Sequence, residues 1–76
     1  MEKLMIAPGT SISVAEGVTY TFSVTYSDNL ELVHSKVLSF ERLKDGTYWL
    51  NQEDGTIVEI PSGKYLSLSA SKQRVA

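Results

Sequence analysis

Apolar and polar side chains alternate strictly over residues 18–26. Valine, tyrosine and phenylalanine occupy the even positions of this segment, and threonine or serine occupies the odd ones. A period of two places successive side chains on opposite faces of a strand, and β-branched and aromatic residues favour that conformation. The pattern predicts a half-buried strand with one apolar and one hydroxyl-rich face. Its register should be well fixed, because a shift by one residue would exchange the two faces.

Three further apolar runs follow at residues 37–40, 47–50 and 56–60. The two connections between them, residues 44–46 and 53–55, each contain an Asp-Gly pair. Such a pair between β-branched and aromatic residues is a strong hairpin signal, because glycine supplies the positive φ that a tight reversal needs. Two such turns in succession predict a three-stranded antiparallel meander. Its expected core-facing residues are Leu38, Phe40, Tyr48, Leu50, Val58 and Ile60.

The segment that connects the first long strand to the meander fits two structures. Asp28 and Glu31 have the spacing of a helix-capping box, and the apolar residues that follow recur at helical intervals. Leu30 and Leu32, however, alternate as they would in a strand. The sequence therefore leaves a short helix over residues 29–36 and a strand as open alternatives.

The two ends of the chain carry weaker patterns. A short apolar run at residues 4–7 stops at Pro8-Gly9, which predicts a first strand followed by a turn. Residues 66–70 alternate in character and predict a last strand, and residues 71–76 have the composition of a flexible polar tail. The sequence thus predicts a single small β domain over residues 1–70.

About six short strands in so small a protein cannot form a flat open sheet, because one face of each strand must be covered. The expected fold is all-β, either a strongly bent antiparallel sheet or a small SH3-like or OB-like barrel, with a short helix near residues 29–36 as an open addition. At 76 residues the domain is near the size at which a core forms without disulfides or a metal. We therefore expect modest stability, or support from a partner or an oligomer.

Few side chains in this sequence suit catalysis or metal binding. The absence of cysteine excludes a disulfide, a thiolate zinc site and a cysteine nucleophile. His34 is the one histidine, and a Glu-x-x-His pair with no second histidine or cysteine does not make a metal site. No serine lies in a Gly-x-Ser-x-Gly motif, and Gly63-Lys64 lacks the rest of a phosphate-binding loop. We expect no enzyme activity, no metal and no cofactor.

The charge pattern limits the partners. The net charge is −2, and the acidic excess lies in the first half of the chain. Without a strongly basic surface, tight sequence-independent binding to duplex nucleic acid is disfavoured. The sequence shows no signal peptide and no apolar run long enough to span a membrane. We expect a cytoplasmic protein that does not act at a membrane.

Adjacent aromatic residues are the main candidates for binding. Tyr48 and Trp49 must point to opposite faces of one strand, so at least one of them should be partly exposed unless both faces are covered. Tyr65 is a second candidate, because tryptophan and tyrosine are enriched at interface hot spots. The alternative for Trp49 is a place in a minor apolar cluster beneath a neighbouring segment. The candidates for a positive rim, with dispersed surface charge as the alternative, are Arg42, Lys44, Lys64, Lys72 and Arg74.

The chain resembles the small Sm-like barrel modules typified by Rof in two short segments and in the alternating strands that follow them. The segments are residues 28–32, Asp-Asn-Leu-Glu-Leu, and residues 43–46, Leu-Lys-Asp-Gly. Rof is an inhibitor of the transcription terminator Rho. The resemblance implies a helix near residues 29–36 that leads into a bent five-stranded sheet. It also implies an acidic contact surface around Asp28 and Glu31, and a protein that binds another protein and blocks its RNA-binding surface.

These observations together predict a non-catalytic protein-binding module, a small regulator or inhibitor of the kind that phages and mobile elements encode. One alternative is a single-stranded nucleic-acid module, in which Tyr48, Trp49 or Tyr65 stack on bases and the lysines follow the phosphates. The other is a structural subunit of a homo-oligomeric assembly, joined through free sheet edges.

Overall fold

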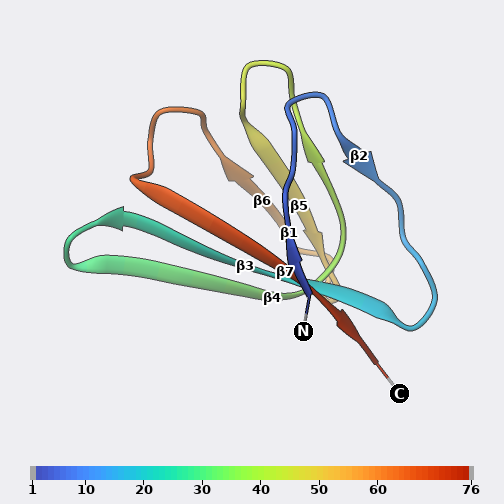
Figure 1. Ribbon diagram of the computed structural model, residues 1–76. Helices are drawn as coiled ribbons and strands as arrows, with labels where there is room; N and C mark the ends of the chain where they lie inside the picture. Colours follow the sequence, from blue (N-terminus) through green and yellow to red (C-terminus); the bar gives the residue numbers. More distant parts are fainter. Residues whose placement is uncertain (1, 76) are drawn as a thin grey trace.

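The computed structural model describes residues 2–75, which form seven strands and no helix (Figure 1). All strand pairs are antiparallel, in the order β1-β7-β3-β4-β5-β6, and β2 pairs with β4. The predicted all-β fold with a strongly bent antiparallel sheet is confirmed. The sheet does not close into a barrel, because β1 and β6 end its strand order in the described part of the chain. The strands are β1 (Glu2–Leu4), β2 (Ser11–Ile12), β3 (Val18–Ser27), β4 (Leu30–Arg42), β5 (Tyr48–Gln52), β6 (Ile57–Ile60) and β7 (Ser67–Arg74).

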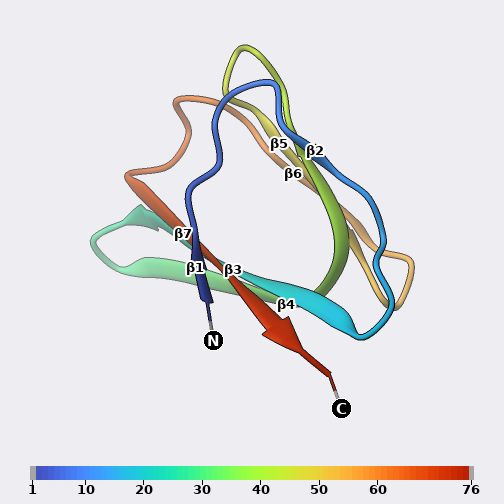
Figure 2. The ribbon, with the colours of Figure 1, turned by 45° about the vertical axis from the view of Figure 1, so that its right-hand side comes forward.

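The bend in the sheet lies in the long strand β4. Its first half pairs with β3 and its second half with β5, and an extra residue interrupts the register on each side of Val37. Lys36 adopts a φ of 55°, a left-handed conformation that is uncommon for a residue with a side chain. Such bulges bend a strand and increase its twist. β4 consequently turns from one layer of the molecule into the other (Figures 1 and 2).

Of the two structures left open for residues 29–36, the strand forms and the helix does not: Asn29 lies in the turn, and residues 30–36 belong to β4. They pair with β3 from Ser27↔Leu30 to Phe22↔His34. The backbone groups that a helix would use internally are bonded across the hairpin instead, and such tertiary pairing overrides a short helical pattern. The prediction of Leu38 as a core residue is wrong, since the irregularity beside Val37 changes the alternation. Val37 is fully buried, whereas Leu38 is only half-buried.

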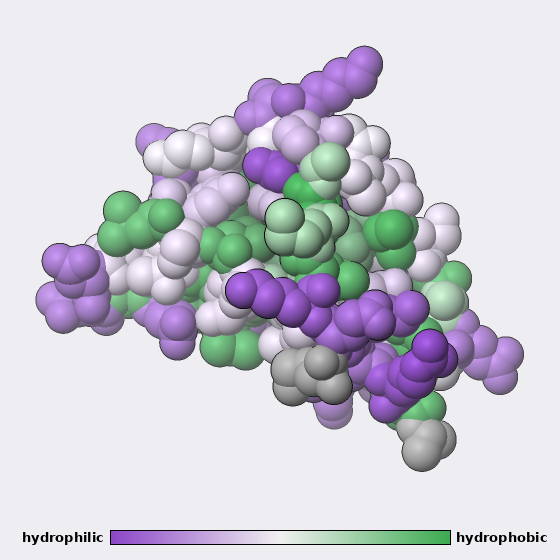
Figure 3. Space-filling view, viewed as in Figure 1, coloured by the Kyte–Doolittle hydropathy of each residue, from purple (hydrophilic) through white to green (hydrophobic). Residues whose placement is uncertain are grey.

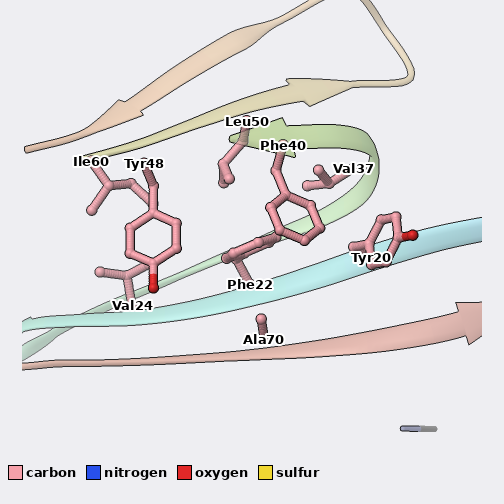
Figure 4. Packing of buried hydrophobic residues seen from close by; sticks show 9 residues of the cluster. All are labelled: Tyr20, Phe22, Val24, Val37, Phe40, Tyr48, Leu50, Ile60 and Ala70. Atoms are coloured by element: carbon pink, nitrogen blue, oxygen red, sulfur yellow. The ribbon is translucent and has the colours of Figure 1, made fainter. Parts of the chain in front are cut away.

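The core lies between the two layers that β4 connects. Figure 4 shows side chains of β3 and β7 on one side and of β5 and β6 on the other, with the bend of β4 at one end. The ring of Phe22 packs edge to face against Phe40 and Tyr48, with centroid distances of 5.1 and 6.0 Å. Aromatic pairs prefer this arrangement. Tyr20 packs against Phe40 in the same way at 5.0 Å. The buried cluster consists of Tyr20, Phe22, Val24, Val37, Phe40, Tyr48, Leu50, Ile60 and Ala70.

Both predicted Asp-Gly turns are confirmed. Gly46 and Gly55 have φ values of 98° and 90°, and each donates its backbone N–H to the carbonyl three residues earlier, at 2.9 and 3.0 Å. Asp45 accepts a hydrogen bond from the backbone N–H two residues later, and Asp54 does the same, both at 2.9 Å. These hydrogen bonds favour the ionised carboxylate and lower the pKa of both aspartates. The two hairpins of the meander therefore use the same local construction.

The C-terminal boundary lies further along the chain than the sequence predicted. Residues 71–74, expected in a flexible tail, belong to β7 and pair with β3 up to Val18↔Arg74. The Thr21 hydroxyl donates a hydrogen bond to Oε1 of Gln73 at 3.2 Å, and Val75 donates its N–H to the carbonyl of Gly17 at 2.8 Å. The polar composition of residues 71–74 did not indicate this strand, although Ser71, Lys72 and Gln73 are half-buried beside β3.

Replacing Lys36 by glycine is expected to stabilise the protein by about 0.5–1 kcal/mol, because glycine adopts positive φ without steric strain. Lys36→Val should destabilise it by about 1–2 kcal/mol, since a β-branched residue tolerates this conformation poorly. Ser35→Gly, one residue earlier, is the matched control and should lose about 0.5–1 kcal/mol. Urea unfolding of the three variants measures the differences. A destabilising Lys36→Gly would contradict the bulge geometry.

Candidate functional site

His34 lies at the bend of β4, directly across the hairpin from Phe22. Its side chain is half-buried, and its Nε2 atom is buried without a hydrogen-bond partner. Burial disfavours the charged imidazolium and lowers the pKa of His34. Within residues 2–75, no group of three histidine, cysteine, aspartate or glutamate residues is placed to hold a metal ion. The geometry gives His34 a packing role beside the core.

The burial of His34 predicts a pH dependence of stability. Because its pKa is lower in the folded than in the unfolded state, the unfolded chain binds the proton first as pH falls. Stability should therefore decrease as pH falls through the unfolded-state pKa of about 6.5. The urea midpoint should be lower at pH 5.5 than at pH 7.5, and His34→Gln should remove most of that difference. An equal pH dependence in both proteins would contradict the lowered pKa.

Three of the predicted binding residues form one internal cluster. Tyr48 is 4% exposed, and its ring centroid lies 6.5 Å from that of the half-buried Tyr65. The guanidinium of Arg42 lies 5.1 Å from the centre of the Tyr48 ring and donates a hydrogen bond to the carbonyl of Ile6. Burial raises the pKa of Tyr48, and the charge of Arg42 opposes part of that rise. This cluster holds the segment after β1 against the core, so Tyr48 is not an external contact residue.

Trp49 lies on the outer face of the sheet, as expected from its alternation with Tyr48. It is half-buried and stands between two glutamates in the strand register: Glu41 on β4 and Glu59 on β6. Directly opposed residues in antiparallel strands share a face, with Cβ atoms about 5 Å apart. Both glutamates are exposed, and neither makes a side-chain hydrogen bond within residues 2–75. The surroundings of Trp49 are therefore acidic.

Of the remaining predicted residues, four are exposed and lie in two regions: one is the tip of the β3–β4 hairpin, and the other is a pair of turns that meet at Gly46 and Ser62. Asp28 lies in the turn between β3 and β4, and Glu31 lies opposite Thr25 near the same tip. Lys44 lies in the turn after β4, and Lys64 in the connection between β6 and β7. Arg42 points inward to Tyr48. Arg42 is therefore not part of the expected positive rim, which was predicted to consist of Arg42, Lys44, Lys64, Lys72 and Arg74.

A group of exposed leucines at the end of the β3–β4 hairpin was not singled out from the sequence. Leu30, Leu32 and Leu66 are 47%, 44% and 66% exposed, and we call them the hairpin-tip patch. Leu32 is paired with Val24, which is also paired with Leu68, and the backbone of Leu66 is bonded to Thr25. The patch therefore continues the apolar face of β3, β4 and β7 outward. Their alternation indicated a strand face, but only the positions of the other strands show that this end is uncovered.

The uncovered patch results from unequal strand lengths. β5 pairs with β4 only from Val37 to Arg42, so the second layer does not reach the first residues of β4. In Figures 1 and 2 the β3–β4 hairpin projects beyond β5 and β6. Figure 3 shows hydrophobic surface at the start of β7 next to the hydrophilic tip of the hairpin. This end of the molecule combines an apolar surface with an acidic border.

Searches against protein-family models, curated proteins and solved structures found no match to this chain. Residues 2–75 contain no helix with the length and apolar character needed to cross a membrane.

Proposed function

We propose that this protein is a non-catalytic protein-binding module that acts as a small regulator or inhibitor by covering a surface of its partner. The hairpin-tip patch is the observation that carries the proposal. Three exposed leucines from β4 and the segment before β7 lie together at one end of the molecule. Contiguous apolar surface of this kind is typical of interaction sites, whereas isolated exposed apolar residues are common and carry little meaning.

The border of the patch supports the same interpretation. Asp28 and Glu31 are exposed beside it, so the surface has an apolar centre and a charged edge. This is the usual anatomy of a protein interface, in which the centre supplies most of the binding energy and the rim supplies specificity. The same two acids are the contact residues that the resemblance to Rof implies, although the helix expected there is absent. A partner with an apolar groove and basic border residues would fit this end.

Capture from a cell lysate tests the proposal with matched variants. The unmodified protein should recover one dominant protein, and the double variant Leu32→Asp with Leu66→Asp should lose it. Val14→Asp is the control, because Val14 is 64% exposed but lies in the loop before β3. Circular dichroism and tryptophan fluorescence establish that all variants are folded. The proposal fails if nothing is recovered at high bait concentration, or if the double variant retains the same protein.

The single-stranded nucleic-acid alternative has less support. It requires an accessible aromatic platform beside positive charge, whereas Trp49 stands between Glu41 and Glu59 and Tyr48 is in the core. An oligonucleotide added at low salt should leave the fluorescence of Trp49 unchanged. Salt-sensitive quenching would restore this alternative.

The homo-oligomer alternative draws on the unpaired strand edges within residues 2–75, which include the outer edges of β1, β2 and β6. Exposed edges can pair with a second copy of the same chain. Light scattering over a wide concentration range distinguishes this arrangement from a monomeric binding module, since a constant monomer mass excludes it.

A further inference from the structure

We infer that the outer edge of β6 binds an extended, basic segment of a protein partner, which adds to the sheet as a further strand. The inference rests on the proposed protein-binding function but uses a surface other than the hairpin-tip patch. Three features of the described residues carry it: an unpaired strand edge, a row of acidic and aromatic side chains that ends at this edge, and the absence of basic residues from the surrounding segment.

The edge itself is open. β6 pairs with β5 on one side, through Tyr48↔Ile60 to Asn51↔Ile57, and with no strand of residues 2–75 on the other. In an antiparallel pair, alternate residues direct their N–H and C=O groups away from the partner strand. The outer edge of β6 therefore offers unpaired backbone donors and acceptors, which an extended peptide can satisfy by β-augmentation.

The side-chain row specifies what the added strand should carry. Glu41, Trp49 and Glu59 lie side by side across β4, β5 and β6 on the outer face. The next position in this row falls on the added strand, directly opposite Glu59, where a lysine or arginine would form a cross-strand ion pair. A long cationic side chain at that position can also reach the indole of Trp49, the best aromatic partner for a cation.

Acidic charge predominates in the segment that contains β6, which Lys44 and Lys64 flank. Residues 45–63 contain four acids and no lysine or arginine. The acids are Asp45, Glu53, Asp54 and Glu59. An acidic strand would meet like charge here, and a basic strand would meet opposite charge, so electrostatics select one class of segment. The inner face of β6 carries Val58, half-buried, and Ile60, fully buried. The best ligand therefore alternates basic residues toward the outer face with apolar residues toward the core.

Synthetic peptides test this directly. An octapeptide that alternates lysine and valine should bind and change the fluorescence of Trp49. It should also slow hydrogen exchange of the backbone amides in residues 57–60. The same peptide with glutamate in place of lysine should bind at least tenfold more weakly, and a peptide of equal composition with consecutive lysines should do the same. Glu59→Lys should weaken binding of the alternating peptide at least tenfold, whereas Glu16→Lys, an equal charge change in the turn before β3, should alter it less than threefold.

Each remaining outcome would overturn the inference. Absence of saturation at millimolar peptide, equal binding of the three peptides, or no effect of Glu59→Lys would show that the edge does not select a basic strand. A protein dimer with protected β6 amides would show that a second copy occupies the edge. Failure here is distinguishable from failure of the proposed function, because the lysate experiment depends on Leu32 and Leu66. The variant that carries aspartate at these two positions should bind the alternating peptide normally.

Discussion

Phe22→Ala is expected to destabilise the protein by about 3–5 kcal/mol, the largest effect of any single change considered. Phe22 is fully buried, and its ring contacts Phe40 and Tyr48 from the opposite layer. A domain of this size has a total stability of only about 4–11 kcal/mol at the usual 0.05–0.15 kcal/mol per residue. The variant should therefore be largely unfolded at moderate urea concentration, as measured by circular dichroism and tryptophan fluorescence.

Two controls keep this prediction testable even if the alanine variant does not fold. Phe22→Leu preserves most of the volume and should cost less than about 1.5 kcal/mol. Val33→Ala removes apolar atoms from a 59% exposed position on the same hairpin and should change stability by less than about 0.5 kcal/mol. If Phe22→Ala lowered the free energy of unfolding no more than Val33→Ala, Phe22 would not contribute to a core between the two layers.

Gly46→Ala is expected to have the second largest effect, a destabilisation of about 1–3 kcal/mol. The φ of 98° at this position disfavours any residue with a side chain. An added Cβ would also lie 3.0 Å from Oγ of Ser62 and 3.5 Å from its Cβ. Chemical unfolding of purified variants measures the loss.

Gly55 provides a matched control for this prediction. It occupies the same position in the second Asp-Gly turn, with a φ of 90°, and an added Cβ there would meet nothing within 4 Å. Gly55→Ala should therefore show the conformational cost alone, about 1–2 kcal/mol. In a Ser62→Ala background, the destabilisation caused by Gly46→Ala should fall close to that caused by Gly55→Ala. If Gly46→Ala cost less than Gly55→Ala, the contact with Ser62 would not be strained.

The elements that the sequence predicted correctly depend on local signals. The strand over residues 18–26 follows from strict alternation, and its inward residues Tyr20, Phe22 and Val24 are buried. The turns at Gly46 and Gly55 follow from the need for positive φ. The opposite orientations of Tyr48 and Trp49 follow from their adjacency on one strand. In each case the structure follows from the conformation of a few neighbouring residues or from the alternation of side chains along a strand.

The differences from expectation all concern how strands pair. Residues 29–36 fitted a helix as well as a strand, but residues 30–34 are paired with β3 in a hairpin. Leu38 had the expected alternation, but an irregularity beside Val37 placed the neighbouring residue in the core. Residues 71–74 lacked an apolar signature, but β3 supplies them with a partner strand. No property of these segments alone reveals which strand will lie beside them.

For the candidate binding residues too, the sequence indicated some properties of single residues but not their neighbours in the fold. The sequence left Trp49 open between an exposed recognition residue and a minor apolar cluster, and the resemblance to Rof implied contacts at Asp28 and Glu31. Trp49 is half-buried, and both acids are exposed. The sequence did not reveal that Arg42 would stack on Tyr48, or that Trp49 would lie between two glutamates. These neighbours come from different strands, so their proximity depends on the register between strands.

By itself, the sequence determined that this protein would be all-β, where two of its turns lie, and which face of its first long strand would be buried. Those properties depend on side-chain alternation and on the conformational freedom of glycine, which act locally. The tertiary structure decided where β4 bends, which strands end the sheet, and which apolar side chains remain uncovered. Those features depend on the relative lengths and registers of strands far apart in the chain, and the proposed binding surfaces arise from them.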